Sequence, residues 1–596
     1  MTQLPIEDYA MIGDSRSAAL VSKDGSIDWL CWPRYDSRSV FARLLDVKRG
    51  GHFAIHPPDR YSVRRRYIDD TNVLETTFET DTGAVRLVDL MPALTEEEKR
   101  SRLLPLRQLL RRVEGIGGEV RMVATYAPRP DYARVEPRLD KRHGNIVWCA
   151  YGPEVWHLRS DLPIDIDRST ARADFTVRKG ARHYFALSYE TQSPAVLGNI
   201  NDIADADIER SIRFWNEWSS HLTYEGPYRD EVLRSALVLK LLAYAPSGGI
   251  VAAPTTSLPE KIGGVRNWDY RYCWLRDASF TVSALYDCGF ETEGGAFVDW
   301  LLYATRLTQP KLQILYDVFG ESRLPERTLD HLEGYAGSKP VRTGNAASDQ
   351  FQLDVYAQVL GALEESVDRG EELPRDTRRL VSRLADLVCR RWPEPDNGMW
   401  EKRSPRRHHV HGKVMAWAAL DCACRIAEKR HIINDVERWR KAMAAIEADV
   451  VANGFNRKLN SFVAAYGSEE LDASLLDLAR VGFLEPADPR LAGTIDAVRR
   501  HLGRDELIYR YSGDTDDGLP PGEGAFLACS FWLAEALAIV KRFDEAHDVF
   551  EKAIRRANDV GLLSEEVDVD SGRLIGNFPQ GLTHVALMNA ALRLLT

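Results

Sequence analysis

The chain has 596 residues, of which 44% are hydrophobic and 28% are charged, a composition typical of a globular protein with two or three domains. Its formal net charge of -11 argues against nucleic acid and against an anionic membrane surface as partners, because both require clustered lysine and arginine. The most apolar stretch, residues 525–540, is shorter than a bilayer span and contains Glu535, so we expect no membrane-spanning segment.

The first two hundred residues carry the pattern of short β-strands. Segments 18–22 and 26–32 flank an Asp24-Gly25 turn, and a second turn of the same kind lies at 81–83. Two strand-like runs joined by so short a turn predict a β-hairpin. Many such strands in succession predict an all-β sandwich, which we place at residues 1–204.

Helical periods dominate the rest of the chain, after a helical linker predicted at residues 205–227. Val410, Val414 and Trp417, for example, recur every three or four positions and form one apolar helix face. No short repeat is visible, so a regular solenoid is not expected. The segment 228–596 therefore predicts a closed array of helix pairs, with long loops at one end available for a site.

The densest group of chemically active side chains lies at residues 267–277, where four aromatic residues, two arginines and two aspartates share eleven positions. Aromatic faces, including those of Trp268 and Trp274, pack on the apolar patches of sugars, and charged planar groups bind vicinal hydroxyls. The segment therefore favours a sugar site. The alternative is a plain helix start, with Asp277 in the first turn and Arg276 as its ion-pair partner.

Two glutamates are candidates for acid and base chemistry. Glu401 follows Trp400, and Glu565 follows an apolar pair and precedes Glu566. Glycoside hydrolysis needs one carboxylic acid for the leaving oxygen and one carboxylate for the nucleophile. Trp400 can desolvate Glu401 and raise its pKa, as an acid catalyst requires. On these residues alone, a surface glutamate paired with a basic neighbour, and a solvated acidic loop, explain the two positions better than catalysis does.

Cysteines and histidines predict neither a disulfide framework nor a metal site. Eight cysteines form no disulfide or zinc pattern, and residues 1–8 lack the regions of a signal peptide, which together predict reduced thiols in the cytoplasm. The trio of His408, His409 and His411 lies among basic residues, and the loop 514–518 lacks the glutamate of a calcium loop. We expect no metal and no cofactor, although dependence on phosphate or a divalent ion stays open.

In chain order, these segments resemble glycoside hydrolase family 15, the family of glucoamylases and of bacterial and archaeal trehalases, with the bacterial branch closer. The resemblance spans nearly the whole chain. It rests on the following segments: Ile6-Glu7-Asp8-Tyr9, Gly25-Ser26-Ile27-Asp28-Trp29, Ala252-Ala253-Pro254-Thr255-Thr256, the aromatic block 267–277, 396–401, Glu523-Gly524-Ala525-Phe526 and Gly576-Asn577-Phe578-Pro579-Gln580.

The resemblance implies an N-terminal β-sandwich followed by an (α/α)6 barrel, and an inverting mechanism. Carried over by motif, Glu401 would be the general acid and Glu565 the general base. Arg276 and Asp277 would grip the hydroxyls of the terminal glucose. Trp274 and Trp400 would form aromatic walls, with Trp268 as a further substrate contact. At position 402 a lysine stands where fungal glucoamylases carry a second glutamate, which puts a preference for starch-like chains in doubt.

The sequence therefore predicts an exo-acting, inverting hydrolase that releases glucose from the non-reducing end of a small α-glucoside. Trehalose is the leading substrate, followed by malto-oligosaccharides and isomaltose-type α-1,6-glucosides. Two other classes stay open, namely an inverting phosphorylase and a non-catalytic sugar-binding protein. No nucleic acid or membrane partner is expected, and whether the chain forms a homo-oligomer is open.

Overall fold

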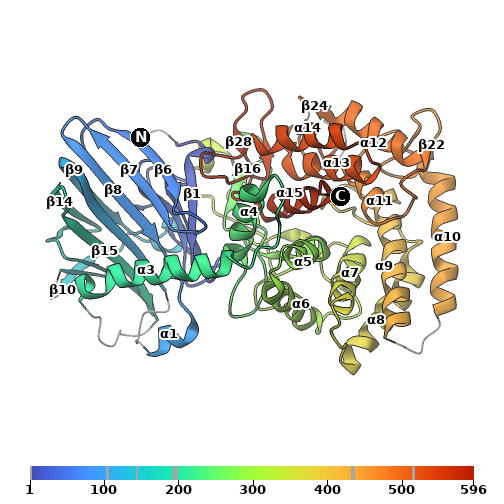
Figure 1. Ribbon diagram of the computed structural model, residues 1–596, viewed down its shortest axis with the longest axis horizontal. Helices are drawn as coiled ribbons and strands as arrows, with labels where there is room; N and C mark the ends of the chain where they lie inside the picture. Colours follow the sequence, from blue (N-terminus) through green and yellow to red (C-terminus); the bar gives the residue numbers. More distant parts are fainter. Residues whose placement is uncertain are drawn as a thin grey trace.

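The computed structural model describes residues 3–101, 107–142, 145–191, 199–430, 436–505, 507–512 and 517–595. Figure 1 shows a strand-rich half beside a helical half, joined by the long helix α3 (Ile200–Ser219), which runs along the strands. The predicted fold class, strands first and helices after, is confirmed. The division at 1–204, 205–227 and 228–596 stays a prediction.

The strand-rich half is two antiparallel layers that share one strand. The 20-residue strand β9 (Gln108–Ala127) pairs through its first half with β8 and β15, and through its second half with β5 and β14. It therefore turns the corner between the layers, as expected where a strand changes sheets in a sandwich. The strands of the layers are β1 (Tyr9–Gly13), β2 (Ala18–Ser22), β3 (Ser26–Cys31), β4 (Ser39–Phe41), β5 (His52–His56), β6 (Ser62–Tyr67), β7 (Leu74–Thr80), β8 (Gly83–Leu90), β10 (Leu139–Arg142), β11 (Ile146–Tyr151), β12 (Glu154–Ser160), β13 (Asp165–Asp167), β14 (Thr170–Arg178) and β15 (Arg182–Glu190).

Both predicted hairpins are present. The strands β2 and β3 pair on either side of the Asp24-Gly25 turn, and β7 and β8 pair on either side of Asp81 and Thr82. Gly25 adopts φ +73° and packs against the backbone of β5, where a Cβ atom would come within 2.4 Å of the Ile55 carbonyl oxygen. A glycine is therefore required at this turn by both conformation and space.

In the helical half, six helices of the described chain form a closed ring. The helix α5 contacts α7, α7 contacts α9, and contacts continue through α11, α13 and α15 back to α5. The ring helices are α5 (Ala278–Asp287), α7 (Asp354–Asp368), α9 (Val410–Lys429), α11 (Asp477–Arg480), α13 (Leu527–Ile539) and α15 (Gly581–Arg593). The residues from Leu527 to Ala538 of α13 are all buried, as expected for a helix enclosed on every side.

Outer helices cover this ring and are apolar on one face. The outer helices are α4 (Arg229–Leu242) on α15, α6 (Glu291–Thr305) on α5, α8 (Arg375–Arg391) and α10 (Val436–Gly454) on α9, and α12 (Pro489–Leu502) and α14 (Phe543–Ile554) on α13. In α8 the buried residues recur every three or four positions, the pattern of a helix packed on one side. No helix within the described ranges is both long enough and apolar enough to cross a membrane.

Candidate active site

The aromatic block forms one wall of the site because its backbone is extended and its side chains alternate between the two sides of the segment. Trp268, Tyr270 and Trp274 face a cavity of about 310 Å³, whereas the intervening Asp269 and Arg271 face the strand-rich half. The Arg271 guanidinium donates to the Asp269 carboxylate at 2.7 Å and to the Ser37 carbonyl oxygen at 2.9 Å. A period of two places one set of side chains on each side of an extended segment, so the block serves the site and the domain contact together.

This cavity combines aromatic, cationic and acidic side chains. Its lining is drawn from the loops before α5, α7, α9 and α13, so the site lies where these loops meet. The residues that line it are Arg266, Trp268, Tyr270, Trp274, Asn345, Ala346, Ala347, Gln350, Asn397, Trp400, Glu401, Lys402, Arg403, Arg510, Tyr511, Asp517 and Leu519. Aromatic faces with a few placed polar groups are typical of a small-molecule site.

Glu401 lies in the cavity wall and is held by direct contacts. Trp274 Nε1 donates to its Oε1 at 3.1 Å, Arg276 Nη1 lies 2.9 Å from the same oxygen, and Gln350 Nε2 donates to its carbonyl oxygen at 3.1 Å. Its φ of +50° is a left-handed conformation that costs a glutamate about 1–3 kcal/mol and that surrounding contacts must hold. Burial raises the pKa of Glu401 to about 7, and the Arg276 guanidinium opposes that rise.

Trp400 and Lys402, on either side of Glu401, are fixed by one buried aspartate. Trp400 Nε1 donates to Asp472 Oδ1 at 2.7 Å, and Lys402 Nζ lies 3.5 Å from Asp472 Oδ2. The Lys402 ammonium also lies 4.5 Å from the centre of the Tyr511 ring, within the range of a cation–π contact. The lysine that departs from the fungal pattern is therefore anchored beside the cavity.

Arg276 and Asp277 lie directly behind Glu401, outside the cavity lining. Arg276 Nε lies 2.8 Å from Asp277 Oδ1, and its Nη2 makes a contact of 3.5 Å with the other oxygen. The Asp277 side chain is 13% exposed. The pair is thus ordered by an internal ion pair and by Glu401, and Nη2 is the least engaged of the guanidinium nitrogens.

Trp268 lines the cavity with its ring already in contact with cations. The guanidinium carbons of Arg342 and Arg403 lie 4.5 Å and 4.7 Å from the ring centre. Arg403 in turn pairs with Glu326 at 2.9 Å. The indole therefore has less free face for a sugar than the sequence suggested.

Glu565 is fully buried and is not among the residues that line the cavity. The Asn577 backbone N–H donates to its Oε2 at 3.0 Å, and Oε1 has no hydrogen-bond partner among the described residues. Gly576, at φ +74°, packs so closely that a Cβ atom would lie 2.7 Å from Oε2. Burial, followed by the nearby Glu260, raises the pKa of Glu565 to about 8, and Arg510 opposes the rise.

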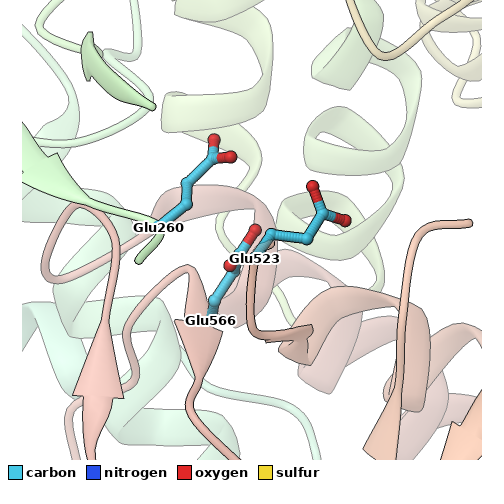
Figure 2. Close-up of side chains that lie close together, drawn as sticks. All are labelled: Glu260, Glu523 and Glu566. Carbon is cyan, nitrogen blue, oxygen red and sulfur yellow. The ribbon is translucent and has the colours of Figure 1, made fainter. Parts of the chain in front are cut away.

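Glu566 points away from Glu565 into a separate acidic cluster. It begins β27 (Glu566–Val567), which pairs with β26 (Ala525–Phe526), and its Oε2 accepts the Gly524 N–H at 2.7 Å. Figure 2 shows Glu566 converging with Glu260 and Glu523 from separate segments. Successive side chains of an extended segment face opposite sides, which explains why the adjacent glutamates have different surroundings.

This cluster is already occupied by a cation from the chain itself. Carboxylate oxygens of Glu260, Glu523 and Glu566 lie within 4.8 Å of one another, a spacing that a metal ion also allows. Arg510 Nη2, however, lies 2.8, 2.7 and 3.4 Å from these three carboxylates. These charge-assisted contacts offset part of the negative charge, while Glu260 Oε1 and Glu566 Oε1 have no hydrogen-bond partner among the described residues. The side chains as arranged therefore bind an arginine.

Two of the three histidines, His408 and His411, are directed to different neighbours. His408 stacks on Tyr466 at 5.7 Å, and His411 Nε2 lies 3.0 Å from Asp477 Oδ2. The loop predicted to resemble a calcium loop lies partly outside the described residues, at 513–516. Its described end, Asp517, pairs with Arg266 at 2.6 Å and lines the cavity, so this segment borders the site.

Tyr270 connects the two predicted catalytic glutamates. Its ring lies 5.0 Å from that of Trp274, which donates to Glu401. Burial raises the pKa of Tyr270, and both Glu565 and Glu401 raise it further. Tyr270 was not among the predicted site residues, although the alternation that exposes Trp268 and Trp274 also indicates this position.

Comparison with known proteins gives the family. A model described as "Glycosyl hydrolases family 15" matches residues 226–592, and a model described as "Trehalase-like, N-terminal" matches residues 1–184. The chain is 36% identical to "Trehalase" of Mycobacterium tuberculosis, over 99% of this chain and 90% of that protein, and 34% identical to "Trehalase" of Thermoplasma volcanium, over 99% and 93%.

A solved structure described as bacterial glucoamylase complexed with acarbose has the same fold, with a TM-score of 0.72 and 14% identity over 100% of this chain and 94% of that chain. The identities to relatives extend over both halves of the chain, and the family model covers most of the helical half. The chain therefore belongs to glycosyl hydrolases family 15 and is a glycoside hydrolase.

Proposed function

We propose that the chain is a trehalase that hydrolyses α,α-trehalose with inversion, with Glu401 as general acid and Glu565 as general base. The observation that carries this proposal is the position of Glu401 in the cavity wall, where it accepts from Trp274 and where Tyr270 packs on Trp274. Glu565 is buried outside the lining and raises the pKa of Tyr270. Neither is a solvated surface residue, since Glu565 is fully buried and the Glu401 side chain is 18% exposed. Glu566 is engaged by Gly524 and Arg510, which favours Glu565 as the base.

In the proposed reaction Glu401 gives its proton to the glycosidic oxygen as the bond from that oxygen to C1 breaks. Glu565 takes a proton from a water molecule, whose oxygen bonds to C1 from the opposite face of the ring. The products are two glucose molecules, and exchange of one proton with solvent restores both carboxyl groups. Inversion needs room for the water, so the two carboxyl groups should lie about 6.5–9.5 Å apart.

Further parts of the proposal concern the sugar contacts. Arg276 and Asp277 would orient the ring of the reacting glucose, with Nη2 of Arg276 available for a hydroxyl. Trp274 and Trp400 would form walls beside the sugar ring. Trp268 would contact the leaving glucose through the edge of its indole, because cations lie over the indole face. Such orientation converts binding energy into a reactive geometry.

Trehalose is preferred over longer α-glucosides for two reasons. The full-length relatives at 36% and 34% identity carry the name trehalase. The cavity, at about 310 Å³, is at the small end of the range for ligand pockets and is bordered by the Asp517–Leu519 segment. Malto-oligosaccharides and isomaltose-type glucosides remain the alternative substrates.

The test of substrate is glucose release from trehalose, maltose, isomaltose and maltotriose, with the anomers followed by NMR. We expect trehalose to give the highest kcat/KM. Inversion at one ring of trehalose yields equal amounts of β-glucose and α-glucose, because the leaving glucose keeps its configuration, whereas retention yields α-glucose alone. Release of α-glucose alone would exclude inversion, and glucose 1-phosphate formed in the presence of phosphate would indicate a phosphorylase.

The pH dependence follows from the two pKa values. The active form has Glu565 ionised, so activity rises with pH towards about 8, and Glu401 protonated, so activity falls as pH increases above about 7. The kcat/KM of trehalose should therefore follow a bell with its maximum between these values. Because the assigned base has the higher pKa, only about one molecule in twenty is in the active form at the maximum. A maximum below about pH 5, where ordinary carboxyl groups titrate, would contradict this account.

We further propose that the ring of six helices is the (α/α)6 barrel of the family and that the protein is cytoplasmic. None of the eight cysteines forms a disulfide, and seven of them are buried, which agrees with a reducing compartment.

A further inference from the structure

We propose that Arg65, in the strand-rich half, is a positioning residue for the general base, because it anchors the loop 558–564 that leads to Glu565. The inference rests on the proposed role of Glu565 as the base. It concerns a residue of the other domain, outside the cavity lining, whose effect on the reaction would pass through this loop.

Arg65 is a buried cation that joins the two halves of the chain. It lies in β6, its side chain is 1% exposed, and its Nη2 and Nε bind the two carboxylate oxygens of Asp559 at 2.7 and 3.0 Å. The same guanidinium donates to the carbonyl oxygens of Asp8 at 2.5 Å and Glu7 at 3.1 Å. A fork that binds a carboxylate in this way fixes both distance and orientation.

Asn558 makes the second connection. Its Nδ2 donates to the carbonyl oxygens of Glu7 at 3.1 Å and Tyr9 at 2.8 Å. Its Oδ1 accepts the N–H groups of Val560 at 3.1 Å and Leu562 at 2.9 Å. One side chain therefore links the edge of the sheet to the turn that precedes Glu565.

The far end of the loop is held by the helical half. The Leu563 N–H donates to His584 Nε2 at 3.2 Å, and Thr583 Oγ1 donates to the Ser564 carbonyl oxygen at 3.0 Å. Both partners belong to the ring helix α15. The loop thus spans from the strand-rich half to the ring, and Glu565 follows directly after its second attachment.

Between the two attachments the loop borders a cavity, although Leu562 and Leu563 are themselves buried in the core. Val560, Gly561 and Leu563 line a cavity of about 500 Å³ whose other walls include Tyr67 and Arg234. Side chains around such a space give up contacts that a packed core provides. The hydrogen bonds and ion pair at Asn558 and Asp559 therefore add to the apolar packing that positions the loop.

Release of the loop should lower kcat without weakening the binding of glucose. Displacing a catalytic group by about 1 Å can cost on the order of 10²-fold in rate, so release of Asp559 should lower kcat through Glu565. The groups proposed to bind the sugar, Arg276 and Trp274, come from the loop before α5 and have no contact with Arg65 among the described residues. Binding of glucose should consequently be preserved.

The experiment compares R65A, R65K, D559N and the double variant R65A/D559N in the full chain. The matched control is R64A, since Arg64 directly precedes Arg65 in β6 and forms an exposed ion pair with Glu79. The Arg64 side chain is 78% exposed and the Glu79 side chain is 45% exposed. We expect R65A and D559N to lower kcat on trehalose by about tenfold to a hundredfold, with the glucose inhibition constant unchanged within about twofold. R65K should recover part of the loss, the double variant should be no worse than the poorer single variant, and R64A should match the wild type.

The inference is overturned if D559N keeps the wild-type kcat, or if glucose binding weakens in parallel with kcat. Should R65A fail to fold, D559N decides the question, because Asp559 is partly exposed and asparagine conserves its size; its folding is checked by circular dichroism and thermal unfolding. Failure of the base assignment would appear elsewhere, as hydrolysis that survives in E565Q, whereas failure of this inference leaves E565Q inactive and R65A active.

Discussion

Replacement of Glu401 by glutamine should lower kcat on trehalose by about 10²–10⁴-fold, the usual contribution of a general acid. Glucose is a poor leaving group unless its oxygen is protonated, and the amide has no proton to give. The change is nearly isosteric, and the amide oxygen can still accept from Trp274 Nε1, as Oε1 does at 3.1 Å. The loss should therefore be confined to chemistry.

Steady-state kinetics on trehalose and a glucose titration check this prediction together. The glucose inhibition constant should stay within about tenfold of the wild type, because the sugar contacts proposed for Trp274 and Trp400 do not depend on the carboxylate. Turnover at the wild-type rate in E401Q would remove Glu401 from the role of acid.

Replacement of Glu565 by glutamine should lower kcat by about 10³–10⁴-fold, towards the upper end of the contribution of a general base. The adjacent Glu566 is not placed to substitute for it, since Glu566 accepts the Gly524 N–H at 2.7 Å and faces Arg510. The matched control is E566Q, which changes the adjacent residue by the same atoms.

We expect E566Q to keep kcat within about tenfold of the wild type, with a lower thermal stability, because it removes a charge from a buried ion-pair cluster. Initial rates and thermal unfolding of the two variants give the comparison. A large loss in E566Q together with activity in E565Q would reverse the assignment of the base.

Much of the fold could be predicted from local patterns. The hairpin turns at Asp24-Gly25 and at residues 81–83 are present because short turns with a glycine set the register of the strands beside them. The face of Val410 and Val414 is buried in α9, as the helical period indicates. What local patterns do not give is the sharing of β9 between two layers, because that depends on partners that lie far apart in the sequence.

The site was predictable in part and for identifiable reasons. Trp274, Trp400 and Glu401 could be located from the family resemblance, and the structure brings them to one cavity. Tyr270 could have been found, since an extended segment with alternating aromatic residues directs it to the same side. Adjacent glutamates must face opposite sides of a strand, yet alternation alone does not say whether Glu565 or Glu566 faces the site.

Other parts of the site required the tertiary structure. Asp472 fixes Trp400 and Lys402 from about seventy residues away, and Arg510 binds carboxylates from three separate segments. Single charged residues of this kind are frequent in any sequence, so no local spacing distinguishes them. Arg65 is similar, because its pairing with Asp559 joins the two halves of the chain.

The most direct test of the central claim, Glu401 as acid and Glu565 as base, uses α-glucosyl fluoride beside trehalose. Fluoride leaves without protonation, so this substrate needs the base but not the acid. We predict that E401Q hydrolyses the fluoride within about tenfold of the wild-type rate while remaining impaired on trehalose, and that E565Q fails on both. E401Q equally impaired on both substrates, or E565Q active on the fluoride, would contradict the account.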